Sequence, residues 1–248
     1  MSEHRLFSRA VIRLSPQDAG EDVASFLQGL LTNDVTGTLP AYAGLLSAQG
    51  KAIAGLIVWP AGDGAMLLDC EAERADELAK RLSLYRLRRK IAIERDDTLG
   101  VYWQAEPGDG AAADPRLGEL GQRWIASVSA DDKGADEAWL AHRLRLGVME
   151  SHEEIGDILW LETNAAELGG VSFPKGCYVG QENTARMNWR QKINRRLVVV
   201  PLDRSNEKRR RAAYPALGLA VDHLRVEDLD PALLPEWLRT ALDGAESN

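Results

Sequence analysis

One stretch of the sequence, VSFPKGCYVGQENTAR over residues 171–186, places Cys177 between two glycines and two residues after Lys175. A thiol reacts as the thiolate, and its pKa falls beside a cation or at the N-terminus of a helix. Lys175 supplies the cation, and the polar residues after Gly180 can begin a helix. A lone cysteine is more often a small buried residue in a turn, however. The spacing alone leaves both interpretations open.

The elements before this stretch predict an α+β architecture, in which helices pack on antiparallel strands. Turn residues at Gln49-Gly50 and at 62–64 divide residues 43–70 into three strands. Apolar residues at helical spacing predict helices over 21–35 and 71–90. Further strands are expected over 6–14, 91–97, 99–106 and 122–130, and a further helix over 136–148.

The composition of the 248 residues excludes several classes of protein. A net charge of −8 argues against a general binder of nucleic acid or of anionic membranes, since both need a positive field. Cys70 and Cys177 are too far apart in sequence for a disulfide framework, and no CxxC motif occurs. The four histidines have no metal-ligand spacing, so no metal site is predicted. No apolar run is long enough for a membrane span or a secretion signal, and we expect a cytoplasmic protein.

The composition changes after Arg186. Ten basic residues stand between Arg186 and Arg211, and they include Lys192. Within this segment RRLVVVPL (195–202) reads as a buried strand, and YPALGLAVDHL (214–224) is the one other strand candidate. Asp230-Pro231 is typical of the start of a helix, which the apolar spacing continues to residue 242. We predict a body over residues 1–190 and a smaller β domain with a terminal helix over 191–248.

The pattern F-x-KGCYVGQE-x-x-AR closely resembles the signature of the YgfZ family of tetrahydrofolate-dependent proteins. That family is related to the glycine-cleavage T-protein and includes mitochondrial iron–sulfur maturation factors. The matching motif residues are Lys175, Gly176, Cys177, Tyr178, Gly180, Gln181, Glu182 and Arg186. Four other segments resemble the family in the same order: Phe26–Val35, Leu45–Ala54, Tyr85–Ile91 and Arg145–Phe173. T-proteins carry Asp-Phe where this chain has Cys177-Tyr178, which places the chain on the YgfZ side.

The resemblance implies a T-protein-like fold, the folate-binding fold of aminomethyltransferases, with tetrahydrofolate or a derivative as cofactor. The polar residues that match the family's folate-binding positions are Asn33, Asp34, Glu162 and Asn164. A carboxylate can accept the N–H edge of a pterin, and the acidic folate tail suits a site such as Tyr85 with Arg88. From the residues alone, Asn33-Asp34 is equally a turn after a helix, and Arg88 is equally a solvated surface residue. Family members end in a small β-barrel, so the short C-terminal segment predicts a reduced one.

By resemblance, the chain assists the assembly or repair of iron–sulfur clusters, and its partners are target enzymes or assembly factors. Cys177 is then a transient thiolate ligand to iron or a redox thiol, and the protein is a maturation factor rather than a catalyst. One thiolate does not hold a stable cluster, since four are the norm. Two alternatives stay open. The first is a folate-dependent aminomethyltransferase or demethylase, and the second is a folate-free scaffold that binds an acidic partner through residues 186–211.

Overall fold

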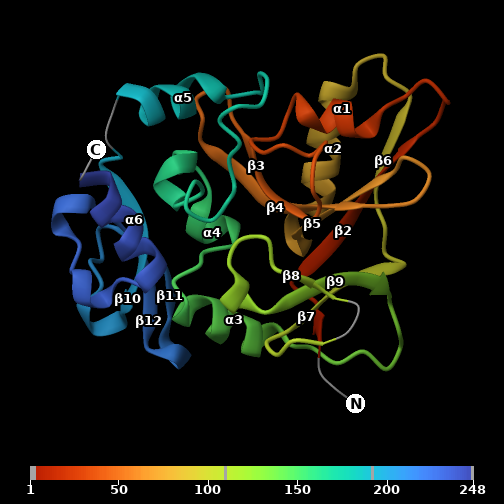
Figure 1. The fold of residues 1–248 in the computed structure, drawn as a ribbon. Helices are drawn as coiled ribbons and strands as arrows, with labels where there is room; N and C mark the ends of the chain where they lie inside the picture. Colours follow the sequence, from red (N-terminus) through yellow and green to blue (C-terminus); the bar gives the residue numbers. More distant parts are fainter. Residues whose placement is uncertain (1–3, 109–110, 191–192, 247–248) are drawn as a thin grey trace.

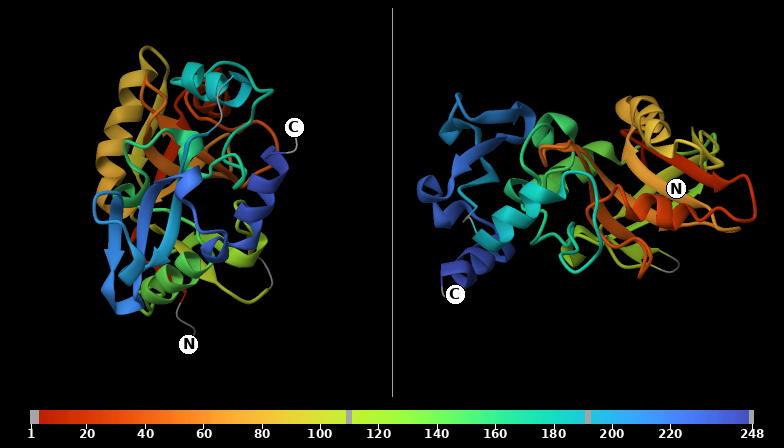
Figure 2. Two further views of the ribbon diagram at one scale, coloured as in Figure 1. Left: turned by 90° about the vertical axis from the view of Figure 1, so that its left-hand side faces the viewer. Right: turned by 90° about the horizontal axis from the view of Figure 1, so that it is seen from above.

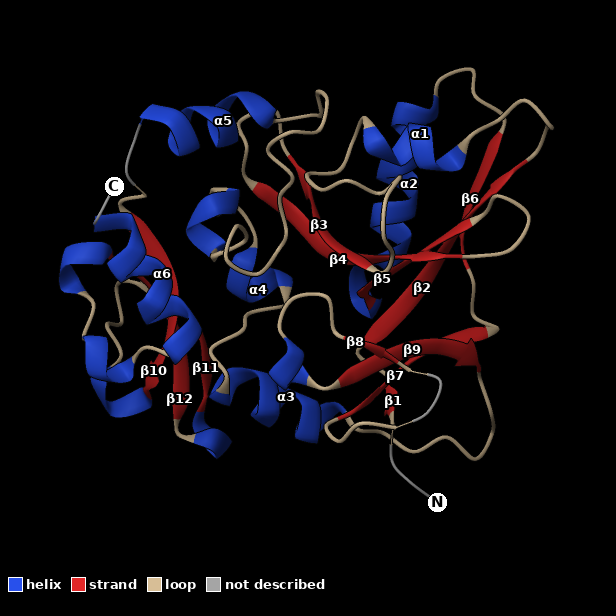
Figure 3. Cartoon of the chain, viewed as in Figure 1, coloured by secondary structure: helices blue, strands red, loops and turns tan. Residues whose placement is uncertain are grey.

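The computed structural model describes residues 4–108, 111–190 and 193–246, and in these its strands form three antiparallel sheets (Figures 1 and 3). Two predicted features reach beyond the described residues: Lys192 of the basic segment and the domain boundary after residue 190. Seen from above, the C-terminal sheet forms one end of the molecule and the first sheet the other (Figure 2). The short helix α4 (His152–Ile155) lies between the sheets (Figure 1).

The first sheet has five strands in the order β3-β4-β5-β2-β6. Its strands are β2 (Arg9–Pro16), β3 (Ala41–Leu46), β4 (Ala52–Pro60), β5 (Met66–Glu71) and β6 (Ile91–Arg95). The predicted three-strand meander is confirmed, because the chain reverses at Gly50 (φ 76°) and at Asp63-Gly64 (φ 58° and 71°). Helices α1 (Val23–Gln28) and α2 (Ala75–Arg86) share one apolar core with this sheet.

Three predicted elements are shorter than the sequence pattern suggested. The strand expected over 6–14 is interrupted because the backbone N–H groups of Phe7 and Ser8 bind the carboxylate of Asp136. The helix expected over 21–35 ends at Gln28, and the chain then turns so that the Thr32 N–H bonds to the Gly44 carbonyl of β3. The helix expected over 71–90 is limited to α2, which a single 3₁₀ turn precedes.

The second sheet has four strands in the order β1-β7-β9-β8. They are β1 (Arg5–Leu6), β7 (Leu99–Gln104), β8 (Ala112–Ala113) and β9 (Gln122–Ser127). Helix α3 (Asp136–Arg145) packs against it through Trp139, which is in ring contact with Trp103 of β7. The predicted strands over 99–106 and 122–130 and the predicted helix over 136–148 are therefore present.

The C-terminal sheet has three strands in the order β10-β12-β11, one more than the sequence suggested. They are β10 (Arg195–Pro201), β11 (Arg210–Tyr214) and β12 (Leu219–Arg225). Strand β11 was not predicted, because the arginines at its start suggested exposure to solvent. In the structure the Arg211 guanidinium instead donates to the carbonyls of Glu154 and Gly156, inside the protein. Asp230 caps a 3₁₀ turn rather than the terminal helix α6 (Glu236–Glu246), which begins after Pro235.

The C-terminal sheet is continuous in packing with the rest of the protein. Leu197 of β10 and Val221 of β12 belong to the same apolar core as Trp160 and Trp139. A smaller core beneath α6 includes Leu238. This packing fixes the sheet directly beside the segment that joins α3 to Cys177.

Candidate functional site

Cys177 lies in the loop that leads into α5 (Gln181–Arg190), and its side chain is exposed. The other cysteine, Cys70, is buried in β5, where burial raises the pKa of its thiol to about 12. A buried, protonated thiol is unreactive, whereas an exposed one can meet metal or oxidant. The structure therefore separates the two cysteines into one packing residue and one accessible group.

The loop that carries Cys177 rests on the turn between β3 and β4. Gly180 has φ of 82°, and a Cβ atom there would lie 2.3 Å from the Ser47 carbonyl oxygen, so only glycine fits. Across from it, Gly50 faces Asn183, whose side-chain amide donates to the Gln49 carbonyl. Two of the segments that resemble the family thus meet at this contact.

Lys175 ties the same loop to the end of α1. Its Nζ donates hydrogen bonds of 2.6 Å to the carbonyls of Gln28 and Leu31 and lies 4.7 Å from the centre of the Tyr178 ring. Burial lowers the pKa of Lys175 to about 8, an effect that the nearby Asp34 carboxylate opposes. The sequence predicted that this cation acts on the Cys177 thiol. In the structure its hydrogen bonds go instead to the carbonyl of Gln28, the last residue of α1, and to that of Leu31, which follows the helix.

Of the remaining motif residues, some pack inside the protein and others are exposed to solvent. Tyr178 is buried, and its backbone N–H lies 3.4 Å from Oε1 of Gln181, which closes the start of α5. Glu182 and Arg186 are exposed on α5. A Cβ atom on Gly176 would meet only open space, so sterics do not require glycine there.

Asn33 and Asp34 follow α1, close to the Lys175 contact. The side-chain amide of Asn33 donates to the carbonyls of Tyr42 and Gly169, and its oxygen accepts from the Asp34 N–H. Asn33 is thus fully used in holding two segments together. Asp34 accepts from Thr36 and from Gln28 through Oδ1, and these bonds lower its pKa. Its Oδ2 has no hydrogen bond to another described residue.

Glu162 and Asn164 point toward the C-terminal sheet. Glu162 lies in a 3₁₀ turn (Trp160–Thr163), and its Oε2 is 2.9 Å from Nε2 of His223 on β12. Asn164 is fully buried, donates to the Leu197 carbonyl and accepts from Arg196. Asn164 therefore joins the body to β10. Glu162 keeps one carboxylate oxygen that makes no hydrogen bond to another described residue.

Tyr85 lies in the last turn of α2 and Arg88 just after that helix ends, away in the chain from the other four predicted folate residues. Tyr85 packs against the core of the first sheet, and Arg88 is exposed. The fit of these six residues to a reduced folate is partial. The side chains of Asn33 and Asn164 already hydrogen-bond to other parts of the fold. Asp34 and Glu162 each retain a carboxylate oxygen that could accept from a pterin N–H edge.

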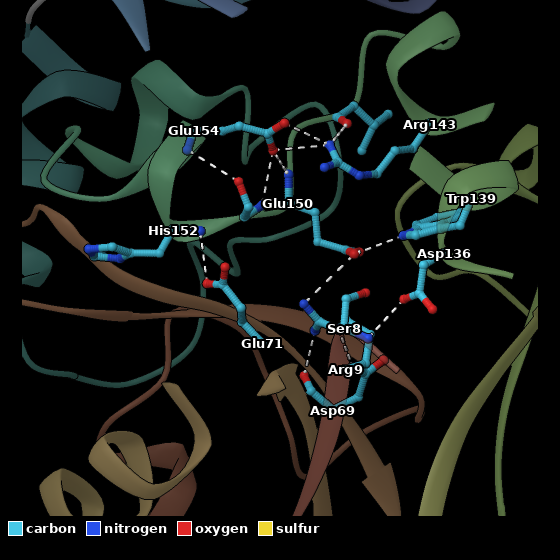
Figure 4. A network of polar contacts seen from close by, with 12 residues as sticks. Ser8, Arg9, Asp69, Glu71, Asp136, Trp139, Arg143, Glu150, His152 and Glu154 are labelled. Carbon is cyan, nitrogen blue, oxygen red and sulfur yellow. Dashed lines mark hydrogen bonds and ion pairs between the residues drawn. The ribbon is translucent and has the colours of Figure 1, made fainter. Parts of the chain in front are cut away.

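A buried ionic network at the meeting point of the sheets was not predicted. Arg9 donates to Asp69 at 2.6 Å, and Glu150 accepts from the Trp139 indole (Figure 4). Glu150 also accepts from Arg116 and Arg123. Burial alone would raise the pKa of Glu150, but four arginines hold it well below its ordinary value: Arg123, Arg9, Arg116 and Arg143. The sequence feature that could have indicated this network is a charged residue inside an otherwise apolar strand, such as Asp69 in MLLDC over 66–70.

The described part of the chain has neither a candidate membrane span nor a cluster of metal-ligating side chains. No helix there has the length and apolar character that a membrane crossing requires. Among the same residues, no three or more His, Cys, Asp or Glu side chains are grouped so that they could hold a metal ion.

Comparison with known proteins places the chain beside iron–sulfur assembly factors. It is 34% identical to the mitochondrial iron–sulfur cluster assembly factor IBA57 of Homo sapiens, over 79% of this chain and 65% of the relative. It is 31% identical to the protein of the same name from Mus musculus, over 80% and 66%, and to the Neurospora crassa homologue, over 78% and 52%. The chain is a homologue of the IBA57 assembly factors. This confirms the YgfZ-family relationship predicted from KGCYVGQE.

The homologue spans about half to two thirds of the length of these relatives. No protein-family model matches it. Its fold is similar to that of the glycine cleavage system aminomethyltransferase T from Bartonella henselae, with a TM-score of 0.66 over 91% of this chain and 79% of the other. At 12% sequence identity this likeness concerns the fold alone. The predicted α+β, T-protein-like fold class is confirmed.

Proposed function

We propose that this IBA57 homologue assists the assembly or repair of iron–sulfur clusters in target enzymes, with the Cys177 thiolate as its working group. The observation that carries the proposal is the exposed Cys177 within KGCYVGQE, in a chain 34% identical to a named cluster assembly factor. Residues on both sides of the thiol are fixed: Lys175 on α1 and Gly180 on the β3–β4 turn. An exposed group between two fixed points is presented to a partner in a defined position.

The chemistry follows from having one accessible thiol. A thiolate is a preferred ligand of iron, but a cluster normally needs four such ligands. Cys70 is buried and does not contribute. We infer that Cys177 binds iron or a cluster transiently while the target enzyme or an assembly factor provides the other ligands. The iron is cargo in this scheme.

Folate binding is the second part of the proposal. A reduced folate in this fold supplies a one-carbon carrier and a redox-active pterin. Asp34 and Glu162 are the residues that remain able to accept its N–H groups. The aminomethyltransferase alternative rests on the fold alone. The scaffold alternative is weakened because Arg196, Arg210 and Arg211 of the basic segment are bound within the protein.

Complementation tests the thiol. A strain that lacks its own homologue receives wild type, Cys177→Ala or Cys70→Ala, and the activity of an iron–sulfur dehydratase is measured beside each variant's melting temperature. Because Cys177 is exposed and makes few core contacts, Cys177→Ala should cost less than about 1 kcal/mol of stability. We expect lost dehydratase activity with near-normal melting for Cys177→Ala, and retained activity for Cys70→Ala.

Two outcomes contradict the proposal. Full rescue by Cys177→Ala removes the thiol from the function, whereas failure together with a collapsed melting temperature makes Cys177 a structural residue. Turnover of a methylamine substrate with tetrahydrofolate as acceptor would favour the aminomethyltransferase instead.

A further inference from the structure

The turn between α2 and β6 holds a leucine in an unfavourable backbone conformation. Leu87 has φ of 51° and ψ of −112°, and the Arg89 N–H bonds to the Arg86 carbonyl at 2.9 Å. These values are those of the second residue of a type II′ turn, a position that glycine favours because a Cβ atom is strained there. Strained positions of this kind cluster at functional sites, so this conformation points to a role for the turn beyond folding.

The same leucine is also poorly buried. Leu87 is 85% exposed and Leu84, one helical turn earlier, is 71% exposed, more than any other large apolar side chain of the described residues. The turn is nevertheless firmly held. Arg86 donates to the Ile91 carbonyl, and the backbone around Lys90 bonds to Gln17 and to the Glu21 carboxylate. Leu87 therefore projects from a fixed support, and neither its conformation nor its exposure benefits the fold.

Cations surround the two leucines. Lys80, Arg81 and Arg88 make no ion pair with another described residue, whereas the adjacent Arg89 and Lys90 pair with Glu21 and Asp18. On α2, Leu84 follows Arg81 by three positions and Lys80 by four, so these side chains are neighbours on the helix, and Arg88 follows Leu87 in the turn where the helix has ended. We call this surface the α2 tip, comprising Lys80, Arg81, Leu84, Leu87 and Arg88. It is a local basic surface on a chain of net charge −8.

We propose that the α2 tip is a docking surface for an acidic, leucine-containing segment of a protein partner. The unpaired cations complement acidic side chains, and the two exposed leucines offer apolar anchors. Three cations are fewer than the four to eight of typical membrane-binding clusters, and the negative charge of the whole chain opposes an anionic bilayer. The tip lies at the edge of the molecule away from the C-terminal sheet (Figure 1). It shares no residue with the Cys177 loop, so the docking surface stands apart from the proposed thiol chemistry.

The partner segment is identified first. The full chain with the photo-crosslinking residue p-benzoylphenylalanine in place of Leu84 is irradiated in an extract of its source cells, and the attached peptide is sequenced. The peptide found is then synthesised, and its Kd is measured by fluorescence anisotropy for the variants. We expect a segment rich in Asp, Glu and Leu.

Leu87→Gly is the decisive variant because it should separate binding from folding. It should raise the melting temperature by relieving the backbone strain, yet weaken binding about tenfold or more by removing an anchor. Arg88→Glu should weaken binding and reduce its dependence on salt. Leu217→Ala, at an exposed leucine in the turn between β11 and β12, and Cys177→Ala should both keep the wild-type Kd. Retained binding by Cys177→Ala distinguishes this surface from the thiol function.

Four results overturn the proposal. They are the absence of any cross-linked peptide, a cross-linked segment without acidic residues, equal Kd values for wild type and Leu87→Gly, and a Leu87→Gly variant that binds weakly only because it melts early. Vesicles of phosphatidylglycerol and phosphatidylcholine provide the membrane arm. Sedimentation of wild type but not Leu87→Gly with these vesicles would assign the tip to a membrane instead.

Discussion

The ammonium group of Lys175 donates a 2.6 Å hydrogen bond to the backbone carbonyl of Leu31, 144 residues earlier in the chain. Hydrogen bonds from a cation are stronger than those between neutral groups, and this cation also bonds to the Gln28 carbonyl. Lys175 thus joins two segments that resemble the YgfZ family, FLQGLLTNDV and KGCYVGQE. We infer that its main role is to position the loop on which Cys177 stands.

Lys175→Gln should loosen this loop. Glutamine is shorter and uncharged, so it cannot reach both carbonyls with equal strength. We expect faster amide hydrogen exchange across residues 172–180, measured by mass spectrometry, with little change in β3 and β4. Lys51→Gln, at an exposed lysine in the adjoining β3–β4 turn, is the matched control and should leave the loop unchanged. Unaltered exchange in Lys175→Gln would show that the loop does not depend on the lysine.

Alkylation distinguishes the two cysteines. Iodoacetamide at neutral pH should modify Cys177 much faster than Cys70, because Cys70 is only 1% exposed and its pKa is raised to about 12 by burial. The rates can be followed by mass spectrometry of peptides from the folded protein. Similar rates would mean that Cys177 is protected and would count against a working thiolate.

The same assay separates two roles for Lys175. If the lysine lowers the pKa of the thiol, as the sequence suggested, Lys175→Gln should slow the alkylation of Cys177. If it only positions the loop, the rate should hold or rise as the loop loosens. The hydrogen bonds of Lys175 to the carbonyls of Gln28 and Leu31 favour the second result.

The buried network predicts a stability that depends on acid. The folded pKa of Glu150 lies well below its unfolded value of about 4.3, so the folded state binds fewer protons. Its contribution is therefore complete above about pH 4.3 and is lost as the pH falls from there toward the folded pKa. Glu150→Gln should cost about 3–5 kcal/mol at pH 7, because it removes a buried negative charge that Arg9, Arg116 and Arg123 share and leaves only Asp69 and Asp114 to offset them, and this difference should shrink in acid.

Urea unfolding at a series of pH values checks this expectation. Glu153→Gln is the control, since Glu153 stands three residues away but is exposed, and the same substitution there should change stability by less than about 0.5 kcal/mol. A difference between wild type and Glu150→Gln that stays constant down to pH 3 would contradict the depressed pKa.

Most of the fold could be predicted from local features of the sequence, such as turn residues and apolar spacing. The parts that depend on hydrogen bonds between distant residues could not. The three-strand meander of the first sheet followed from turn residues such as Gly50 and Gly64, whose positive φ angles require their residue type. Strand β11 was missed because Arg210 and Arg211 suggest solvent, while their partners Ser205 and Glu154 are known only once the chain is folded.

The same distinction applies to the candidate site. The signature KGCYVGQE identified Cys177 and the glycine at 180 from the sequence alone. It did not reveal that Asn33 and Asn164 would be consumed by backbone carbonyls from other elements. Nor did it show that Lys175 would bond to the carbonyl of Leu31, which lies 144 residues earlier in the chain. Residue types could be predicted, whereas their partners depend on tertiary contacts.

Folate binding can be tested at Glu162 with an internal control. Calorimetry with 5-formyltetrahydrofolate on Glu162→Ala should show a loss of about 1–3 kcal/mol in binding free energy if the carboxylate accepts from the pterin. Because Glu162 also contacts His223, the variant alters the C-terminal sheet as well. His223→Ala removes that contact but retains the carboxylate, so it should bind folate nearly as wild type does. Equal losses in the two variants would mean that the contact between Glu162 and His223 matters through structure, and no binding by wild type would favour the folate-free scaffold.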